Sequence, residues 1–272
     1  MNTTNPNQAL WEKGDFTRIA QAMRGSGEAL VAGLGVAPGM DVLDLGCGDG
    51  TTAVPEAQLG ANVLGVDIAE NLVAAGNARA QEFGLSNLRF QWGDASDLAD
   101  LTDDSFDLVV SIFGAMFAPR PYDVAQEMVR VTKPGGRIVM GNWIPGDPTL
   151  VAQILRIAGA YSPPPPECFV SPMTWGVEEE VTNRFGAAGV DTVTCERREY
   201  RFELDAPPAE LLQTFREYYG PTMNAYAAAE AAGNADALHR ELEELFRSQN
   251  DGGPDRTSIG ATYLLVTATK QP

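Results

Sequence analysis

The stretch Val42-Leu43-Asp44-Leu45-Gly46-Cys47-Gly48-Asp49-Gly50 joins a short apolar run directly to a glycine-rich turn. The apolar run predicts a buried β-strand from Asp41 to Leu45, and the residues from Thr51 to Leu59 predict the helix that follows. Glycines in such a turn permit unusual backbone dihedral angles and leave no Cβ between the chain and a ligand. The stretch therefore predicts a strand, turn and helix unit that binds a small molecule.

The spacing and charge of this turn indicate the kind of ligand. Gly46, Gly48 and Gly50 form Gly-x-Gly-x-Gly, which is tighter than the Gly-x-Gly-x-x-Gly that cradles a dinucleotide pyrophosphate. Asp44 and Asp49 would repel a pyrophosphate but suit a ligand that carries an ammonium or sulfonium charge. The turn thus favours a cationic cofactor over the nicotinamide dinucleotide of a dehydrogenase, which would share the fold.

Two further predicted strands end beside a carboxylate. Asp67 ends the strand from Asn62 to Asp67, about twenty residues after the first loop glycine, where a carboxylate can accept both hydroxyls of a ribose. Asp94 follows the strand from Leu88 to Gly93, where it can accept the exocyclic amine of an adenine. Three consecutive strand ends together describe a nucleoside that carries a positive charge.

The remainder of the chain alternates apolar runs with helical patterns, as in a parallel sheet wrapped by helices. We predict an α/β fold, Rossmann-like and doubly wound, with a mostly parallel seven-stranded sheet. The remaining strands are expected at Phe106 to Phe113, Arg137 to Trp143, Asp191 to Phe202 and Thr262 to Thr269. The remaining core helices are expected at Glu70 to Phe83, Tyr122 to Thr132 and Glu178 to Ala188.

Three segments lie outside the predicted cofactor-binding core at 37–144, and we expect all of them to belong to one domain, 1–272. An N-terminal helical cover, 1–36, reads as two short helices between Trp11 and Leu34, interrupted at Gly25-Ser26-Gly27. An excursion, 145–176, contains a helix at Thr149 to Ala160 and the proline run Ser162 to Pro166. A helical cap, 205–258, contains helices at Ala209 to Tyr219, where Gly220-Pro221 ends the helix, and at Ala235 to Arg247.

These motifs together resemble class I S-adenosylmethionine-dependent methyltransferases, of the group that includes the ubiquinone- and menaquinone-pathway enzymes. The resemblance is dense from about Trp11 to Trp143. Asp44 to Gly50 resembles the first motif, Val66-Asp67-Ile68 the second, Gly93-Asp94-Ala95 the third, and Arg130 to Arg137 the turn after the fourth strand. The resemblance implies methyl transfer from S-adenosylmethionine to a small-molecule acceptor, with release of S-adenosylhomocysteine.

The resemblance also implies the cofactor contacts. The loop from Gly46 to Gly50 would hold the methionine part, while Ser111 and Phe113 would face the sulfonium. Trp11 and Phe16 resemble the N-terminal lid of some small-molecule members, although plain core packing would explain both aromatics. The expected cofactor-binding residues are Asp44, Gly46, Cys47, Gly48, Gly50, Asp67, Ile68, Asp94, Ala95, Ser111, Phe113, Trp11 and Phe16.

The sequence indicates the acceptor site less clearly than the cofactor site. Many relatives carry histidines after the fourth strand, whereas Gly114 to Arg120 offers no base here. Met116 and Phe117 from this segment, and Tyr218 and Tyr219 from the cap, are expected to line an acceptor pocket, although the first pair equally suits the start of a helix. The single histidine, His239, borders an apolar helix face and is interpreted as an ordinary surface residue.

Composition excludes other partners. A formal net charge of −18 repels phosphate backbones and anionic membranes, so nucleic acid is not an expected partner. No apolar run reaches the roughly 20 residues of a membrane span, and Met1 to Leu10 lacks the regions of a signal peptide, so we expect a cytoplasmic location. Cys47, Cys168 and Cys195 are widely spaced, and we expect no metal. An alternative function is a catalytically silent cofactor-binding module that acts through a partner.

Overall fold

The computed structural model describes residues 8–165, 167 and 169–272, and within them the chain forms one mixed seven-stranded sheet. The order is β3-β2-β1-β4-β5-β7-β6, and β7 runs antiparallel to both of its neighbours. This arrangement confirms the predicted Rossmann-like, mostly parallel sheet. The strands are β1 (Asp41–Leu45), β2 (Asn62–Asp67), β3 (Leu88–Trp92), β4 (Phe106–Ile112), β5 (Thr132–Trp143), β6 (Val193–Leu204) and β7 (Thr257–Thr269).

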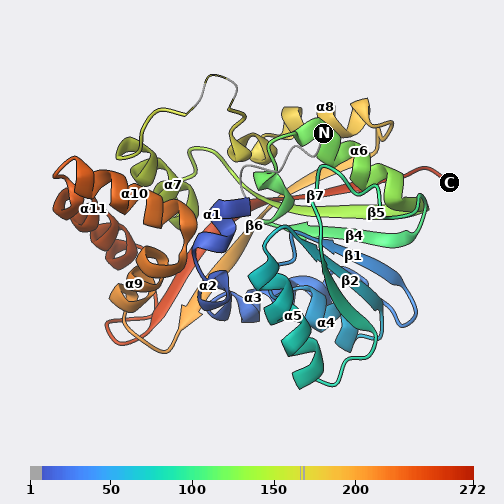
Figure 1. Cartoon of the computed structure of the whole chain (residues 1–272), viewed down its shortest axis with the longest axis horizontal. Coiled ribbons are helices and arrows are strands. Elements are labelled where there is room, and N and C mark those ends of the chain that lie inside the picture. Colours follow the sequence, from blue (N-terminus) through green and yellow to red (C-terminus); the bar gives the residue numbers. More distant parts are fainter. Residues whose placement is uncertain (1–7, 166, 168) are drawn as a thin grey trace.

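Helices cover both faces of the sheet (Figure 1). One face carries α3 (Arg24–Ala32), α4 (Ala53–Gln58) and α5 (Glu70–Glu82), and the other carries α6 (Pro121–Val131) and α8 (Glu178–Ala187). The central strands β1 and β4 are buried from both sides, which is why apolar residues follow one another in them, as in Val42-Leu43 and Leu108-Val109-Val110, rather than alternating with polar ones.

A cap of four helices stands beside the sheet, at the left of Figure 1. It contains α7 (Leu150–Ala160), α9 (Pro208–Tyr218), α10 (Gly220–Ala231) and α11 (Ala235–Ser248), and α7 packs against both α10 and α11. The excursion after β5 therefore contributes a helix to the same cap as the late insertion. The insertion leaves and re-enters the sheet at one point, because Leu204 at the end of β6 pairs with Thr257 at the start of β7.

The helix at α10 was not expected. The Gly220-Pro221 pair was interpreted as the end of a helix, but Pro221 instead stands in the first turn of a new one. Proline is favoured there, because the amide that it lacks would have no partner in the helix and its fixed φ is already helical. The Lys133-Pro134-Gly135-Gly136 turn also differs slightly, since it forms an irregularity within β5 rather than preceding the strand.

The N-terminal cover differs from its prediction as well. It consists of α1 (Gln8–Lys13), α2 (Phe16–Gln21) and α3, and Gly25-Ser26-Gly27 lies inside α3 instead of interrupting a helix. Tertiary contacts override the low helix propensity of these residues. Ser26 exchanges hydrogen bonds with the backbone of Arg201 on the sheet edge, and Gly27 allows close approach to Thr51. Residues 1–7 of the predicted cover, Pro166 and Cys168 lie outside the described residues.

Helices α1 and α2 lie between the cap and the sheet (Figure 1). Two glycines make this contact possible. A Cβ on Gly14 would lie 2.1 Å from the carbonyl oxygen of Tyr218, and a Cβ on Gly220 would lie 2.4 Å from that of Leu10. The Lys13 ammonium also donates a 2.6 Å hydrogen bond to Asn224 of α10. The backbone of α1 and of Gly14, between α1 and α2, is therefore in direct contact with the cap.

Candidate active site

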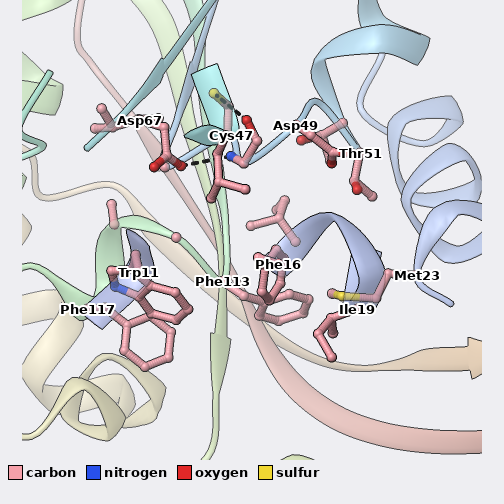
Figure 2. A pocket seen from close by; sticks show the side chains of 18 of the residues that line it. Trp11, Phe16, Ile19, Met23, Cys47, Asp49, Thr51, Asp67, Phe113 and Phe117 are labelled. Carbon is pink, nitrogen blue, oxygen red and sulfur yellow. Dashed lines mark hydrogen bonds between the residues drawn. The ribbon is translucent and has the colours of Figure 1, made fainter. Parts of the chain in front are cut away.

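A large cavity lies where the carboxyl ends of β1, β2 and β4 meet the cap, under α1 and α2. Its empty volume, including its mouth, is about 1170 Å³. One side is formed by polar residues of the glycine loop and of β2, and the other by aromatic side chains (Figure 2). Small-molecule pockets are typically clefts lined mainly by apolar and aromatic side chains with a few polar groups, and this cavity has such a lining.

The glycine loop forms the floor of the polar side. Gly46 and Gly48 both have positive φ, 67° and 56°, which side-chain-bearing residues seldom adopt. The backbone of Gly46 touches that of Gly114 after β4, since a Cβ on Gly46 would lie 2.7 Å from the Gly114 Cα. A Cβ on Gly48 would meet only Phe16, at an ordinary contact distance of 3.9 Å. The first glycine therefore joins two loops, and the second places backbone without a side chain on the cavity lining.

Asp67 ends β2 on the cavity wall, 8% exposed. Its Oδ2 accepts a 2.8 Å hydrogen bond from the amide of Gly48, and its Oδ1 accepts a 2.9 Å bond from the amide of Ala69. Burial raises the pKa of Asp67, although the backbone amides act against this rise. A carboxylate oxygen accepts more than one hydrogen bond, so both oxygens retain capacity for the hydroxyls of a ribose. Ile68, the next residue, also lines the cavity.

Asp49 contributes a second carboxylate to the polar side. It forms an ion pair with Arg24 from α3, and Arg24 also donates a hydrogen bond to the hydroxyl of Thr51. Arg79 donates a 2.7 Å hydrogen bond to the carbonyl oxygen of Asp49. Two arginines thus fix the end of the loop, while Asp49, Thr51 and Thr52 line the cavity.

Asp44, the acidic residue of the first motif, does not line the cavity. It lies beneath the loop, 1% exposed, and accepts a hydrogen bond from the hydroxyl of Thr52. Burial and the nearby charge of Asp67 raise the pKa of Asp44 to about 7. The side chain of Glu56 on α4 is also fully buried, without a hydrogen-bond partner among the described residues, and burial and Asp44 raise its pKa. The loop therefore rests on two buried acidic groups.

Gly50, Asp94 and Ser111, three other expected cofactor contacts, also do not line the cavity. A Cβ on Gly50 would lie 2.7 Å from the ring of Phe90, so this glycine serves core packing. The Oδ1 atom of Asp94 accepts hydrogen bonds from the amide and hydroxyl of Ser96, although its neighbours Gly93 and Ala95 do line the cavity. Ser111 donates a 2.6 Å hydrogen bond to the carbonyl oxygen of Leu45 and thereby ties β4 to β1.

Phe113 lines the cavity directly after β4, in a left-handed conformation with φ 60°. Its ring stacks on that of Trp143 with centroids 3.7 Å apart, and it meets Tyr200 edge-on at 5.1 Å. A bulky residue at positive φ is strained by about 1–3 kcal/mol, and such strain is concentrated at functional sites. The aromatic contacts hold this strained residue on the boundary between the polar and the aromatic side.

The aromatic side combines residues from the N-terminus, the segment after β4 and the cap. The rings of Trp11 and Phe117 lie 4.9 Å apart, and Trp11 also contacts Phe16 and Tyr219. The predicted Trp11, Phe16, Phe117 and Tyr219 are thus brought together with Gly46, Cys47 and Gly48 around one cavity. The structure adds lining residues that the sequence analysis missed: Ile19, Met23, Leu72, Trp143, Val151, Tyr200, Phe202 and Phe215.

One sequence signal identifies two of these missed residues. β6 is strongly charged, yet Tyr200 and Phe202 stand two positions apart, and residues two apart share one face of a strand. Both are buried and line the cavity. The aromatic pair within a charged strand therefore marked the face that the cap covers.

Met116 and Tyr218 were expected in the acceptor pocket but do not line the cavity. Met116 lies in a 3₁₀ turn, where neighbouring side chains point about 120° apart, and it is buried in the core while Phe117 faces the cavity. Tyr218 precedes Tyr219 at the end of α9 and instead contacts the guanidinium of Arg18, 5.7 Å from its ring centre. Of the neighbours Met116 and Phe117, only Phe117 lines the cavity, and of the neighbours Tyr218 and Tyr219, only Tyr219 does.

His239 lies away from the cavity lining, on α11. Its Nδ1 is 2.8 Å from the hydroxyl of Tyr226 on α10, so it links two cap helices. In the described part of the chain, no group of three or more His, Cys, Asp and Glu side chains is arranged to hold a metal. Across the same residues, no helix combines the length and apolar character needed to cross a bilayer.

Comparisons with known proteins agree with this geometry. The family described as Methyltransferase domain matches residues 43–140. Rv1405c of Mycobacterium tuberculosis, a protein of uncharacterised function, is 34% identical over 269 residues, covering 97% of this chain and 94% of that protein. Nocamycin O-methyltransferase of Saccharothrix syringae is 32% identical over 248 residues, covering 85% of each chain.

A solved structure agrees at the level of the fold. Phosphoethanolamine N-methyltransferase 2 of Haemonchus contortus, in complex with S-adenosyl-L-methionine, aligns with a TM-score of 0.62 at 17% identity, covering 100% of this chain and 61% of that one. The backbone of Gly48 on the cavity lining and the buried carboxylate of Asp67 fit such a cofactor. Sequence similarity and site geometry lead to the same assignment: the chain belongs to the family of S-adenosylmethionine-dependent methyltransferases.

Proposed function

We propose that this enzyme methylates a small molecule bound in the aromatic side of the cavity. The observation that supports this proposal is that one cavity joins the loop at Gly46 and Gly48 to the aromatic residues Trp11, Phe117 and Tyr219. The name of its relative nocamycin O-methyltransferase also supports a small-molecule acceptor, as does the motif resemblance to the ubiquinone- and menaquinone-pathway group. The free thiols of Cys47 and Cys195 support a cytoplasmic location.

Residues of the chain would hold the two reactants by different means. The loop glycines and Asp67 would bind the cofactor, which supplies a methyl group on a sulfonium. Methyl transfer is an in-line displacement with a neutral thioether leaving group, so alignment of donor and acceptor accounts for much of the catalysis. The cap and helices α1 and α2 would exclude water, because aromatic side chains form most of the wall opposite the loop.

An acceptor screen tests this proposal. The protein would be incubated with S-adenosylmethionine and a chemically diverse set of phenols, enols, thiols and amines, and release of S-adenosylhomocysteine would be measured. We expect release that depends on an added acceptor and is lost in Gly48→Val. Stoichiometric cofactor binding without acceptor-dependent release across the set would instead favour the silent binding module.

A further inference from the structure

We infer that the acceptor is an uncharged, mainly apolar molecule of aromatic size, whose acidic hydroxyl or enol oxygen accepts a hydrogen bond from Tyr219. This inference rests on the proposed function and adds the chemical class of the acceptor to it. It also assigns Tyr219 a role in holding the reacting oxygen. The charge of the cavity, its unpaired donor and the lack of a base each contribute to the argument.

The charge of the lining separates the two sides of the cavity. Its ionisable carboxylates, Asp49 and Asp67, belong to the glycine loop and β2, and no lysine, arginine or histidine lines it within the described residues. Nine aromatic residues form most of the opposite side: Trp11, Phe16, Phe113, Phe117, Trp143, Tyr200, Phe202, Phe215 and Tyr219. A carboxylate or phosphate ligand would lose its hydration there without gaining a counter-charge, so a neutral ligand is favoured.

The hydroxyl of Tyr219 is the polar group available to such a ligand. Tyr219 is 5% exposed, lines the cavity and has no hydrogen-bond partner in the part of the chain that the structure describes. Burial raises the pKa of its phenol, so the hydroxyl remains protonated and able to donate. Tyr200 also lines the cavity, but its hydroxyl already donates a 3.0 Å bond to the carbonyl oxygen of Met23. The Tyr219 oxygen is not among the fully enclosed unpartnered atoms of the described residues, so it is accessible, and a cavity-lining hydroxyl without a protein partner can donate to a ligand.

An unpaired donor favours an oxygen over an ammonium group. The indole N–H groups of Trp11 and Trp143 have no hydrogen-bond partner among the described residues either, and an indole nitrogen only donates. An ammonium ligand needs acceptors, and the carboxylates lie on the polar side of the cavity. The aromatic side therefore offers donors to an electron-rich oxygen.

The lack of a base determines how acidic that oxygen must be. In the transfer, the acceptor oxygen forms a bond to the methyl carbon while the carbon–sulfur bond breaks with its electron pair remaining on sulfur. The hydroxyl proton must leave, and no side chain on the aromatic side can take it. Solvent can take it beforehand if the hydroxyl is acidic, as in a phenol or an enol conjugated to a carbonyl. A hydrogen bond from Tyr219 would stabilise the resulting oxyanion.

The experiment uses 7-hydroxycoumarin, a bicyclic acidic phenol whose neutral and ionised forms differ in fluorescence. The probe would be titrated against pH in complex with the full chain saturated with S-adenosylhomocysteine. Tyr219→Phe should raise the pKa of the bound probe by about one to two units relative to the wild type. Tyr226→Phe is the matched control, because Tyr226 lies in the same cap but its hydroxyl is paired with His239.

A second measurement needs no variant. At a pH where the free probe is protonated, the wild type should bind neutral 7-hydroxycoumarin at least about tenfold more tightly than phenethylamine or coumarin-3-carboxylate. An unchanged probe pKa in folded Tyr219→Phe, or tighter binding of the amine or the carboxylate, would overturn the inference. Calorimetry with S-adenosylhomocysteine separates the two proposals, since failure to bind it would instead remove the proposed function.

Discussion

The amide of Gly48 donates a 2.8 Å hydrogen bond to Oδ2 of Asp67, so the first two motifs are joined to each other directly. A preformed site of this kind binds its ligand in the native state alone, and the ligand then stabilises the fold by mass action. We expect S-adenosylmethionine and S-adenosylhomocysteine to raise the melting temperature, and NAD to leave it unchanged. Differential scanning fluorimetry checks this, and a shift with NAD alone would contradict the cofactor assignment.

Gly48→Val should abolish cofactor binding while the protein remains folded, because the new side chain would fill the space between the loop and Phe16. The matched control is Gly84→Val. Gly84 also has a positive φ, 66°, but a side chain there would meet nothing within 4 Å. Both variants should lose similar stability through backbone strain, and Gly48→Val alone should lose binding in calorimetry. Equal affinities in the two variants would remove the loop from the site.

Asp67→Ala should weaken S-adenosylmethionine binding by about one to two decades, since hydrogen bonds to charged groups contribute roughly 1.5–3 kcal/mol. His239→Ala should change affinity and turnover little, because His239 contacts Tyr226 within the cap and does not line the cavity. Dissociation constants and single-turnover rates for both variants test this difference. A collapse of turnover in His239→Ala at normal cofactor affinity would identify a base that the geometry does not show.

The buried acidic groups under the loop predict that stability falls as pH rises. The pKa of Asp44 is raised to about 7 and that of Glu56 is also raised, so the folded state binds more protons than the unfolded state above pH 4 or so. The free energy of unfolding of the ligand-free protein should therefore fall between about pH 4 and about pH 7, by the order of 1–3 kcal/mol. Urea denaturation across this range measures the loss.

Glu56→Gln separates this effect from the repulsion of the net charge. Glu56→Gln should reduce the pH dependence of unfolding. Glu179→Gln removes an exposed carboxylate on α8 and should leave most of this pH dependence in place. The same slope in both variants would mean that the buried pair does not cause it.

Gly14→Ala should detach α1 from the cap, because the added Cβ would lie 2.1 Å from the carbonyl oxygen of Tyr218. We expect faster cofactor dissociation in stopped-flow measurements and faster proteolysis near the N-terminus. Gly33→Ala is the control, since its Cβ would make only an ordinary 3.4 Å contact. Identical dissociation rates in the two variants would show that α1 does not retain the cofactor.

The sheet was predictable from the sequence because buried parallel strands are continuous apolar runs with glycines at their ends. The polar side of the cavity was partly predictable for a related reason: Gly48 and Asp67 belong to local motifs at strand ends. Asp44 belongs to the first motif and Ser111 to the fourth strand, yet Asp44 bonds to Thr52 and Ser111 to the carbonyl oxygen of Leu45 instead of lining the cavity. Which face a side chain takes at the end of a strand depends on packing that the motif does not encode.

The aromatic side was less predictable, because its residues come from five separate segments that only the fold brings together. Phe117 and Tyr219 were expected there, but their neighbours Met116 and Tyr218 were also expected and do not line the cavity. A helix or a 3₁₀ turn rotates consecutive side chains by 100–120° or so, and the sequence does not say which residue faces inward.

The pairing of Leu204 with Thr257 has a consequence for how this enzyme can change. Helices α9 to α11 begin and end at one hydrogen-bonded step of the β6 and β7 ladder, so they form a cassette whose exchange leaves the sheet register intact. The cassette carries Phe215 and Tyr219 to the cavity but none of the loop glycines or strand-end carboxylates. Replacement of this one segment would therefore change part of the cavity wall while the loop glycines and Asp67 stay in place.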